Sequence, residues 1–330
     1  MTLAETWEQL ESQLPDGRDG RMVQRVYSDS PIDLFVWAQL REPRRALELH
    51  VPPEDAEFAL PVATRGIAMN RRAQPAGPTV LSLELTDPTA TQLFAVVCSD
   101  IAAAAAHCDD TQTAAAAWAG RYNRWRRLLE RAPQGLSRRR QQGLYAELWA
   151  LRELYAPCLG IDAAVESWVG PDQAARDFER GGHAVEVKSS TTNEPQIVTI
   201  NGERQLDDTE LVSLHLVHLS LEVLPRAGET LPEMVLSLRS LASDGPAESG
   251  LSDALLDAGY ADHHAELYAD VGYALRRLSV MHVREGFPRI VESDLDDGVG
   301  SVHYRLALDA CRSNEVDRAA LEQRLRDAHG

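Results

Sequence analysis

Hydrophobic and polar positions follow two different periods along the chain, and the changes of period divide it into segments. After a short amphipathic helix, the first hundred residues form strand-like runs, Ile32 to Leu40, Arg45 to Val51 and Thr79 to Leu85. Proline and aspartate turns separate these runs, which predicts a β-rich N-terminal domain over residues 1–115. From Thr91 to Glu130 the spacing becomes helical and rich in alanine.

The middle of the chain predicts a helix followed by strands. Ser137 suits an N-cap, and apolar residues then recur at helical spacing at Leu144, Leu148, Leu151, Leu154 and Tyr155. Short strand-like runs follow, at Val165 to Val169, Ala174 to Glu179, His183 to Lys188 and Gln196 to Ile200. The strongly apolar Leu211 to Leu224 is expected to be a central strand. This order predicts an α+β core over residues 116–240.

The last part of the chain, residues 241–330, is expected to be a mostly helical extension with a late β-hairpin. Helical spacing continues from Pro225 to about Arg277, with a Gly/Ser/Asp-rich break near Ser243 to Ser249. The runs Phe287 to Val291 and Ser301 to Leu308 would form the hairpin.

Charge limits how this chain could meet nucleic acid. Asp and Glu outnumber Lys and Arg by 51 to 33, so the whole molecule repels nucleic acid at long range and any contact needs a local basic patch. Residues 121–140 hold eight Arg and one Glu, a local charge of +7. The candidate phosphate-binding residues are Arg121, Arg124, Arg126, Arg127, Arg138, Arg139 and Arg140. A solvated helix face is the alternative interpretation of this run.

Cysteine spacing and hydropathy point to an ordinary soluble protein. The four cysteines are scattered without a CxxC pair, so neither a disulfide framework nor a structural zinc site is expected. The N-terminal residues have no basic segment followed by an apolar one, and no run approaches the roughly 18 apolar residues of a membrane span. We therefore expect a cytoplasmic protein that does not contact a membrane.

One basic residue stands apart from all the others. Of the 33 basic residues, 32 are Arg and only Lys188 is Lys. Arg has therefore replaced Lys wherever a generic positive charge suffices, and the exception indicates a position that demands an ammonium group.

Lys188 belongs to a predicted β-hairpin that closes at Gly181-Gly182. This turn sets the register so that Asp177 faces Glu186, with their Cβ atoms roughly 4.5 to 5.5 Å apart. Because strand side chains alternate, Glu186 and Lys188 share one face. The hairpin therefore predicts that two carboxylates and one ammonium converge.

Two carboxylates so close together are unfavourable unless a cation lies between them, and hard oxygen ligands suit Mg²⁺. Lys188 would then orient or deprotonate a water, or stabilise charge on a phosphate. The alternative is a surface hairpin with a salt-bridge cluster. Glu147 lies on the apolar stripe of the preceding helix, where a carboxylate is costly unless it is paired. It could therefore form a buried ion pair with an Arg or belong to the same metal site.

These residues resemble the PD-(D/E)XK nuclease superfamily, whose restriction-endonuclease-like core is a helix with an acidic residue, a β-meander with Asp and Glu-x-Lys, and a further helix and strand. Glu147 would match the helix acid, Asp177 the motif Asp, and Glu186 with Lys188 the Glu-x-Lys. Arg176 in place of Pro, and the short interval between the motif Asp and Glu, depart from the superfamily.

A closer resemblance, spanning nearly the whole chain, is to the prokaryotic family known as PD-(D/E)XK motif proteins. Its motifs here are Gly143-Leu-Tyr-Ala-Glu-Leu, Trp168-Val-Gly-Pro, Asp177-Phe, Glu186-Val-Lys-Ser-Ser, Arg204-Gln-Leu-Asp and Phe287-Pro-Arg-Ile. The resemblance implies restriction or anti-phage defence, beside ATPase, helicase or methyltransferase partners. Gln205 would correspond to a polar residue near the metal, at the start of the following helix.

The sequence thus leads to the hypothesis of a Mg²⁺-dependent nuclease acting on DNA, with Mn²⁺ as a possible substitute. Asp177, Glu186 and Glu147 would be ligands, Lys188 would activate water, and Gln205 would support the site. A catalytically inactive subunit that binds nucleic acid or partner proteins is the first alternative, favoured by the net charge of -18. An RNase or a small-molecule hydrolase is the second.

Overall fold

A computed structural model describes the chain except residues 14–19, 40–43, 59–62, 76, 133, 173, 244–245 and 329–330. The chain forms two compact units, Met1–Pro133 and Gln134–Gly330. The predicted boundary at residue 115 falls inside helix α3 (Thr111–Arg131), which packs against α2 (Thr91–Ala106) in the first unit. No boundary falls near residue 240, because strands before and after it share one sheet.

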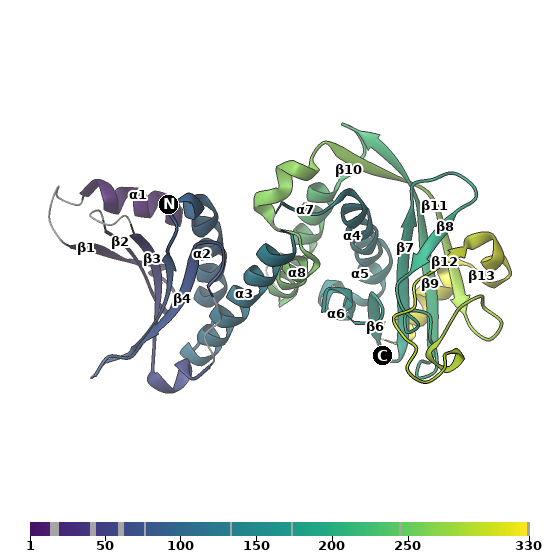
Figure 1. Cartoon of the computed structure of the whole chain (residues 1–330), viewed down its shortest axis with the longest axis horizontal. Coiled ribbons are helices and arrows are strands. Elements are labelled where there is room, and N and C mark those ends of the chain that lie inside the picture. Colours follow the sequence, from purple (N-terminus) through teal and green to yellow (C-terminus); the bar gives the residue numbers. More distant parts are fainter. Residues whose placement is uncertain are drawn as a thin grey trace. The chain divides into compact units, whose positions relative to one another are not determined.

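The first unit is an antiparallel sheet with helices on one face (Figure 1). Its five strands lie in the order β1-β2-β3-β5-β4 and comprise β1 (Arg21–Val26), β2 (Asp33–Gln39), β3 (Arg44–Val51), β4 (Ile67–Arg72) and β5 (Thr79–Leu85). Helix α1 (Leu3–Gln13) joins α2 and α3 on the covered face, and short 3-10 turns occur at Pro53–Ala56 and Pro88–Ala90. The predicted strands are confirmed, although Leu40, the end of the first one, lies outside the described residues.

One helix of this unit corrects the expectation that no segment is apolar enough to span a membrane. Pro88–Ala106 is long and apolar enough, by length and composition, to cross a membrane. In the structure, Phe94, Val97 and Ile101 of this helix are at most 1% exposed and belong to the core of the first unit. Packing in the core accounts for part of the apolar composition, since 33% of the most apolar window of this segment is buried.

The second unit is built on a mixed sheet in the order β10-β11-β9-β7-β6, with β13 beside β11. Its strands are β6 (Phe178–Arg180), β7 (His183–Ser190), β9 (Ser213–Pro225), β10 (Glu229–Thr230), β11 (Val271–Val283) and β13 (Glu315–Val316). β7 and β9 run parallel, whereas the other pairs are antiparallel. The central position predicted for the apolar run beginning at Leu211 is confirmed by β9.

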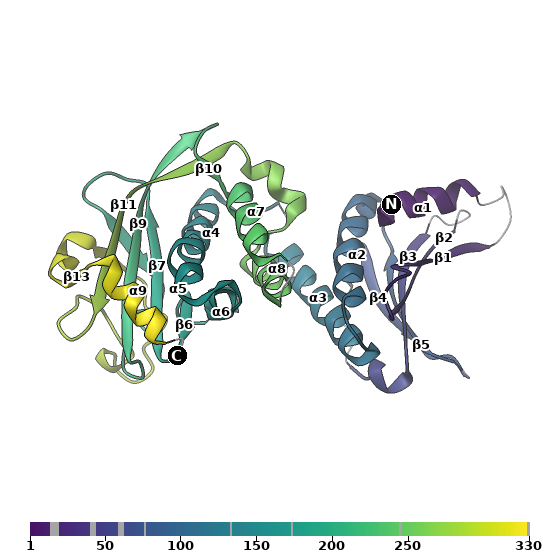
Figure 2. The same cartoon turned by 180° about the vertical axis from the view of Figure 1, so that it is seen from behind.

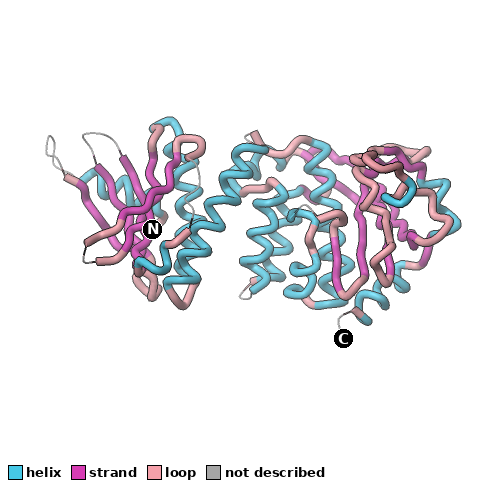
Figure 3. Tube along the Cα trace, turned by 60° about the horizontal axis from the view of Figure 1, so that its bottom comes forward, coloured by secondary structure: helices cyan, strands magenta, loops and turns pink. Residues whose placement is uncertain are grey.

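Helices cover one face of this sheet (Figures 1 and 3). They are α4 (Arg138–Ala150), a π-helical turn (Leu151–Tyr155), α5 (Ala156–Leu159), α6 (Ile161–Ser167), α7 (Leu231–Ala242) and α8 (Pro246–Ala258). Helix α9 (Arg318–Asp327) returns to pack beside α5, as Figure 2 shows. The other face carries a small sheet of β8 (Ile197–Ile200) and β12 (Tyr304–Ala307). Elsewhere in this unit, 3-10 turns occur at Gly170–Asp172, Asp262–Tyr268, Glu292–Asp294 and Leu308–Asn314.

The α+β class with a restriction-endonuclease-like core is confirmed, but three predicted elements differ. Residues 271–277, expected to be helical, form the start of β11, because pairing with β9 outweighs their helical spacing. β12 pairs with β8 and not with Phe287 to Val291. Val165 lies in α6 and not in a strand. Of the predicted break at Ser243 to Ser249, residues 246–249 are helical and begin α8, whereas residues 244–245 lie outside the described residues.

Candidate active site

The β6–β7 hairpin has the register that the Gly-Gly turn predicts. Phe178 pairs with Val185, and Arg180 pairs with His183 across the turn. Gly181 and Gly182 have φ values of 56° and 80°, which glycine adopts without steric cost. The turn residues therefore set which face of β7 each side chain occupies.

Asp177 lies just outside this ladder, which corrects the predicted direct pairing with Glu186. β6 begins only at Phe178, because the backbone carbonyl of Asp177 accepts hydrogen bonds from the N–H groups of Val169 and Gly170, both at 3.0 Å. Its carboxylate still reaches β7, where Oδ2 accepts a hydrogen bond from the Val187 N–H at 2.7 Å. The carboxylate of Asp177 is thus held beside Glu186 by its hydrogen bond to the backbone of β7.

Glu186 is the most deeply buried of the candidate residues, with 0% of its surface exposed. Its Oε1 accepts a hydrogen bond from Nζ of Lys188, whose side chain is 15% exposed. Its Oε2 is buried and has no hydrogen-bond partner in the structure. A buried carboxylate oxygen without a partner is costly, so it marks a position where a cation or a water completes the site.

Glu147 approaches the hairpin from helix α4, which packs on β7. Its Oε2 accepts a hydrogen bond from the indole N–H of Trp168 at 3.0 Å. Of the two roles weighed from the sequence, the buried ion pair with an Arg is not what the described residues show. A hydrogen bond of 3.0 Å from Gln142 to Ser189 also ties this helix to β7.

The three acids and Lys188 affect one another's ionisation. Burial raises the pKa of Glu147 well above its ordinary value, and the charges of Asp177 and Glu186 raise it further. Burial and the charge of Asp177 raise the pKa of Glu186 to about 8. The pKa of Asp177 is also raised, by burial. The charge of Asp177 therefore makes ionisation of both Glu147 and Glu186 harder, and a bound cation would relieve this repulsion.

Lys188 responds in the opposite sense. Burial alone would lower the pKa of its ammonium, but the charges of Glu186 and Asp177 raise it above the ordinary value. Lys188 is therefore a fixed positive charge in this environment.

The donor set fits a hard divalent cation that keeps part of its water shell. Among the described residues, no group of three His, Cys, Asp or Glu side chains has the spacing to hold a metal alone. Mg²⁺ commonly takes only one or two carboxylates and retains several waters. The unpartnered Oε2 of Glu186 and the neighbouring Asp177 and Glu147 supply oxygen donors of this kind.

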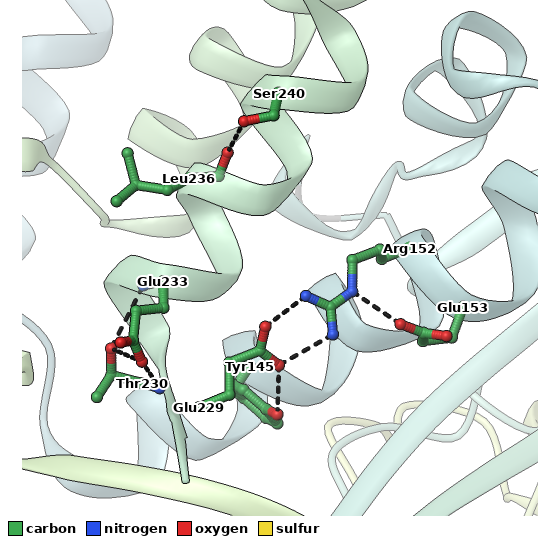
Figure 4. A network of polar contacts seen from close by, with 8 residues as sticks. All are labelled: Tyr145, Arg152, Glu153, Glu229, Thr230, Glu233, Leu236 and Ser240. Atoms are coloured by element: carbon green, nitrogen blue, oxygen red, sulfur yellow. Dashed lines mark hydrogen bonds and ion pairs between the residues drawn. The ribbon is translucent and has the colours of Figure 1, made fainter. Parts of the chain in front are cut away.

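A second polar network fixes the helix that carries Glu147. Figure 4 shows Glu229 between Tyr145 and Arg152, with the tyrosine hydroxyl donating to Oε2 of Glu229 at 3.0 Å and Arg152 donating to both carboxylate oxygens. Arg152 lies on the π-helical turn and also contacts Glu153. The network thus anchors the helix on both sides of Glu147.

Gln205 does not lie where the resemblance implies. Residues 203–206 form a turn between β8 and β9 and not the start of a helix. The Oε1 atom of Gln205 accepts a hydrogen bond from the N–H of Asn201 at 2.8 Å. The described contacts therefore give this residue a local role in the loop.

The basic run is divided between the two units. Arg121 is 7% exposed and donates to both oxygens of Asp100, at 2.6 and 2.7 Å, so it does not contribute to an exposed phosphate-binding surface. Arg126 pairs with Glu130 at 2.9 Å. Arg124 and Arg127 are partly buried on the same helix, whereas Arg138, Arg139 and Arg140 are exposed at the start of α4. Phosphate contact by these exposed residues stays a prediction.

Two residues near the acids were not assigned a role from the sequence. Trp168 was noted only as part of a family motif, yet it donates to Glu147. Arg176, noted as the residue in place of Pro, donates to Glu179 at 2.9 Å and to the carbonyl of Asp207, and its charge acts to lower the pKa of Glu186. Only the tertiary contacts reveal these links.

The comparison with protein families agrees with this geometry. The profile of the family described as "Putative PD-(D/E)XK family member, (DUF4420)" matches residues 3–309, and the chain belongs to this family. No curated protein and no solved structure matches the chain. The fold therefore belongs to the PD-(D/E)XK nuclease superfamily.

Proposed function

We propose that this protein is a nuclease that hydrolyses phosphodiester bonds of DNA with the help of Mg²⁺, or of Mn²⁺ in its place. The observation that carries the proposal is the buried, unpartnered Oε2 of Glu186, which lies among two further carboxylates and beside the single lysine of the chain. Burial of this oxygen without a partner is costly, and a cation bound there would remove that cost.

Asp177, Glu186 and Glu147 would hold the cation, directly or through the waters that it retains, and the cation would supply Lewis-acid stabilisation of the attacked phosphate and activation of a bound water. The hydrogen bond from Val187 to Asp177 orients that carboxylate toward β7. The acidic neighbours of Lys188 raise its pKa by more than burial lowers it, so Lys188 stays protonated near neutral pH. It therefore orients the attacking water or stabilises charge on the phosphate rather than removing a proton.

DNA as the substrate and a role in restriction or anti-phage defence follow from the resemblance to defence-associated proteins. The proposal places the protein in the cytoplasm, with a defence ATPase, helicase or methyltransferase as partner. Such a partner would compensate for the net charge of -18, which weakens unaided DNA binding.

The second candidate function is a catalytically inactive subunit that binds nucleic acid or partner proteins. Two observations favour it, the strongly negative net charge and the lack of a three-ligand metal cluster among the described residues. The unsatisfied Glu186 oxygen speaks against it, because an inactive scaffold could replace that residue without loss.

The test combines metal binding with plasmid cleavage at low salt, for the wild type, Asp177→Ala, Lys188→Ala and Arg180→Ala. Arg180 is the matched control, because it lies on the same hairpin but pairs with Glu166 at 3.2 Å. We expect Mg²⁺- or Mn²⁺-dependent nicking that Asp177→Ala and Lys188→Ala abolish and Arg180→Ala retains.

Cleavage that survives Lys188→Ala would refute the catalytic assignment. Metal binding without cleavage would point to a missing partner or target modification, and the absence of both would support the inactive subunit. Competition with RNA in the same assay separates a DNase from an RNase.

A further inference from the structure

The segment Trp168 to Gly170 contacts two of the site acids at once. The indole N–H of Trp168 donates to the side chain of Glu147 on helix α4, at 3.0 Å. The next two backbone N–H groups, of Val169 and Gly170, donate to the carbonyl of Asp177, each at 3.0 Å. Trp168 itself forms a β-bridge with Phe178, the first residue of β6. Three consecutive residues therefore connect the helix acid with the hairpin acid.

Gly170 allows this connection to be short. A Cβ atom at this position would lie 3.1 Å from both Cα and Oδ1 of Asp177, which is closer than ordinary van der Waals contact. Gly170 is not in the left-handed region of backbone conformation. A Cβ at this position would therefore press on Asp177, which would have to shift by a few tenths of an ångström, whereas the backbone angles alone would allow another residue.

Trp168 is also built into the core rather than placed on a surface. It is 3% exposed, directly after helix α6. Its hydrogen bond engages Oε2 of Glu147 and leaves Oε1 free to face another partner. This hydrogen bond restricts the Glu147 carboxylate to one orientation, because breaking it would leave a buried indole N–H and a buried carboxylate oxygen unpaired.

From these contacts we infer that Trp168 and Gly170 are positioning residues, which set the distance and orientation between Glu147 and Asp177 so that both can serve one cation. The inference rests on the proposed function, because it concerns the geometry of the same site. Neither Trp168 nor Gly170 would contact the cation. Both would support metal binding by holding Glu147 and Asp177 in place. Neighbours of this kind that orient metal ligands typically change metal affinity by about 10- to 100-fold when removed.

The test measures Mn²⁺ binding to the full chain by calorimetry, without DNA. Trp168→Phe keeps the ring and removes only the hydrogen-bond donor, and Gly170→Ala adds only the Cβ. Trp149→Phe is the matched control for the first, because Trp149 is 8% exposed on α4 and has no hydrogen bond to a site acid among the described residues. Gly143→Ala is the control for the second, because a Cβ there meets nothing within 4 Å.

We expect Trp168→Phe and Gly170→Ala to weaken Mn²⁺ binding by about tenfold or more, while both controls keep the wild-type dissociation constant. The melting temperatures without metal separate this effect from a general loss of stability. A purely structural role would lower the melting temperature and leave the dissociation constant of the folded protein unchanged.

Unchanged Mn²⁺ affinity in Gly170→Ala and Trp168→Phe would overturn the positioning role while leaving the proposed nuclease intact. If Trp168→Phe fails to fold, Gly170→Ala decides alone. A wild-type protein that binds no Mn²⁺ would instead overturn the proposed function, and the positioning role with it.

Discussion

Glu48 in the first unit and Glu186 in the second are both buried carboxylates on sheet strands, 4% and 0% exposed, yet their surroundings differ sharply. Glu48 accepts a hydrogen bond from the indole of Trp37 at 2.8 Å and lies 3.2 Å from the His50 ring. Arg21 and Arg72 approach it to 3.4 and 3.8 Å. Within the described ranges, the side chain of Glu186 accepts a hydrogen bond from Lys188, and its Oε2 has no hydrogen-bond partner.

The pKa values follow from this difference. Burial would raise the pKa of Glu48, but the hydrogen bonds from His50 and Trp37 and the charge of Arg21 lower it overall. For Glu186, burial and the charge of Asp177 outweigh the contribution of Lys188 and raise the pKa to about 8. A carboxylate that stabilises a fold is saturated with donors, whereas one that serves a site retains an unused oxygen.

The largest expected effect concerns the basic side chain that pairs with each acid. Lys188→Arg should reduce metal-dependent cleavage by about 100-fold or more, because a planar guanidinium cannot replace a compact ammonium in a buried site. Arg21→Lys beside Glu48 is the control, since its side chain is 42% exposed and any cation suffices there. Single-turnover cleavage rates measure both variants, and equal rates for Lys188→Arg and wild type would show that the solitary lysine has no special role.

Neutralising each acid should affect stability in opposite ways. Glu48→Gln leaves Arg21 and Arg72 without their buried counter-charge and should lower the free energy of unfolding by about 1–3 kcal/mol. Glu186→Gln removes a poorly compensated charge, so the metal-free protein should be at least as stable as wild type at pH 8. Urea unfolding with a chelator present provides the comparison. An equal loss in both variants would make Glu186 a structural residue.

The two acids should also respond to pH with opposite sign. The pKa of Glu48 is lowered on folding, so its stabilisation is present above the ordinary value of 4.5 and is lost as pH falls through the folded value. The pKa of Glu186 is raised to about 8, so its contribution is greatest below 4.5 and is lost as pH rises through about 8.

Melting temperatures of the metal-free wild type, Glu48→Gln and Glu186→Gln across this range test the signs. The deficit of Glu48→Gln should shrink in acid, and the advantage of Glu186→Gln should grow as pH rises from 4.5 toward about 8 and level off above that value. Mn²⁺ affinity of the wild type should rise by up to about tenfold per pH unit below that value, because the cation displaces a proton. A pH-independent affinity would exclude Glu186 as a ligand.

The smallest effect compares the two indole-to-carboxylate hydrogen bonds. Trp37→Phe removes the donor to Glu48, which keeps His50 and Arg21 as partners, so the loss of stability should be about 1 kcal/mol. Mn²⁺ affinity should not change, in contrast to Trp168→Phe. Thermal unfolding and calorimetry on the same samples check this, and a change in Mn²⁺ affinity would contradict the separation between the two acids.

The sequence predicts local elements of this protein well where a short-range rule applies. The Gly181-Gly182 turn specifies the hairpin register, and the alternation along β7 places Glu186 and Lys188 on one face. The apolar run that becomes β9 is recognised as a central strand because both of its faces are buried.

Other assignments failed where distant residues decide the outcome. The helical spacing near Val271 gave way to pairing with β9, and Asp177 left the ladder because Val169 and Gly170 take its carbonyl. Arg121 looked like part of a phosphate-binding run, but Asp100, 21 residues away, neutralises it. The spacing of apolar and polar residues along the chain does not predict any of these contacts.

The sequence by itself determined which residues we propose to carry the chemistry, because the type of residue and a two-residue strand period are local properties. Lys188, Glu186 and Asp177 are identified in this way. The tertiary structure alone decided that Glu147 joins them through Trp168, and that Oε2 of Glu186 is left without a partner. Burial and hydrogen-bond satisfaction depend on what every other segment contributes at one point in space, and the order of residues along the chain does not encode that directly.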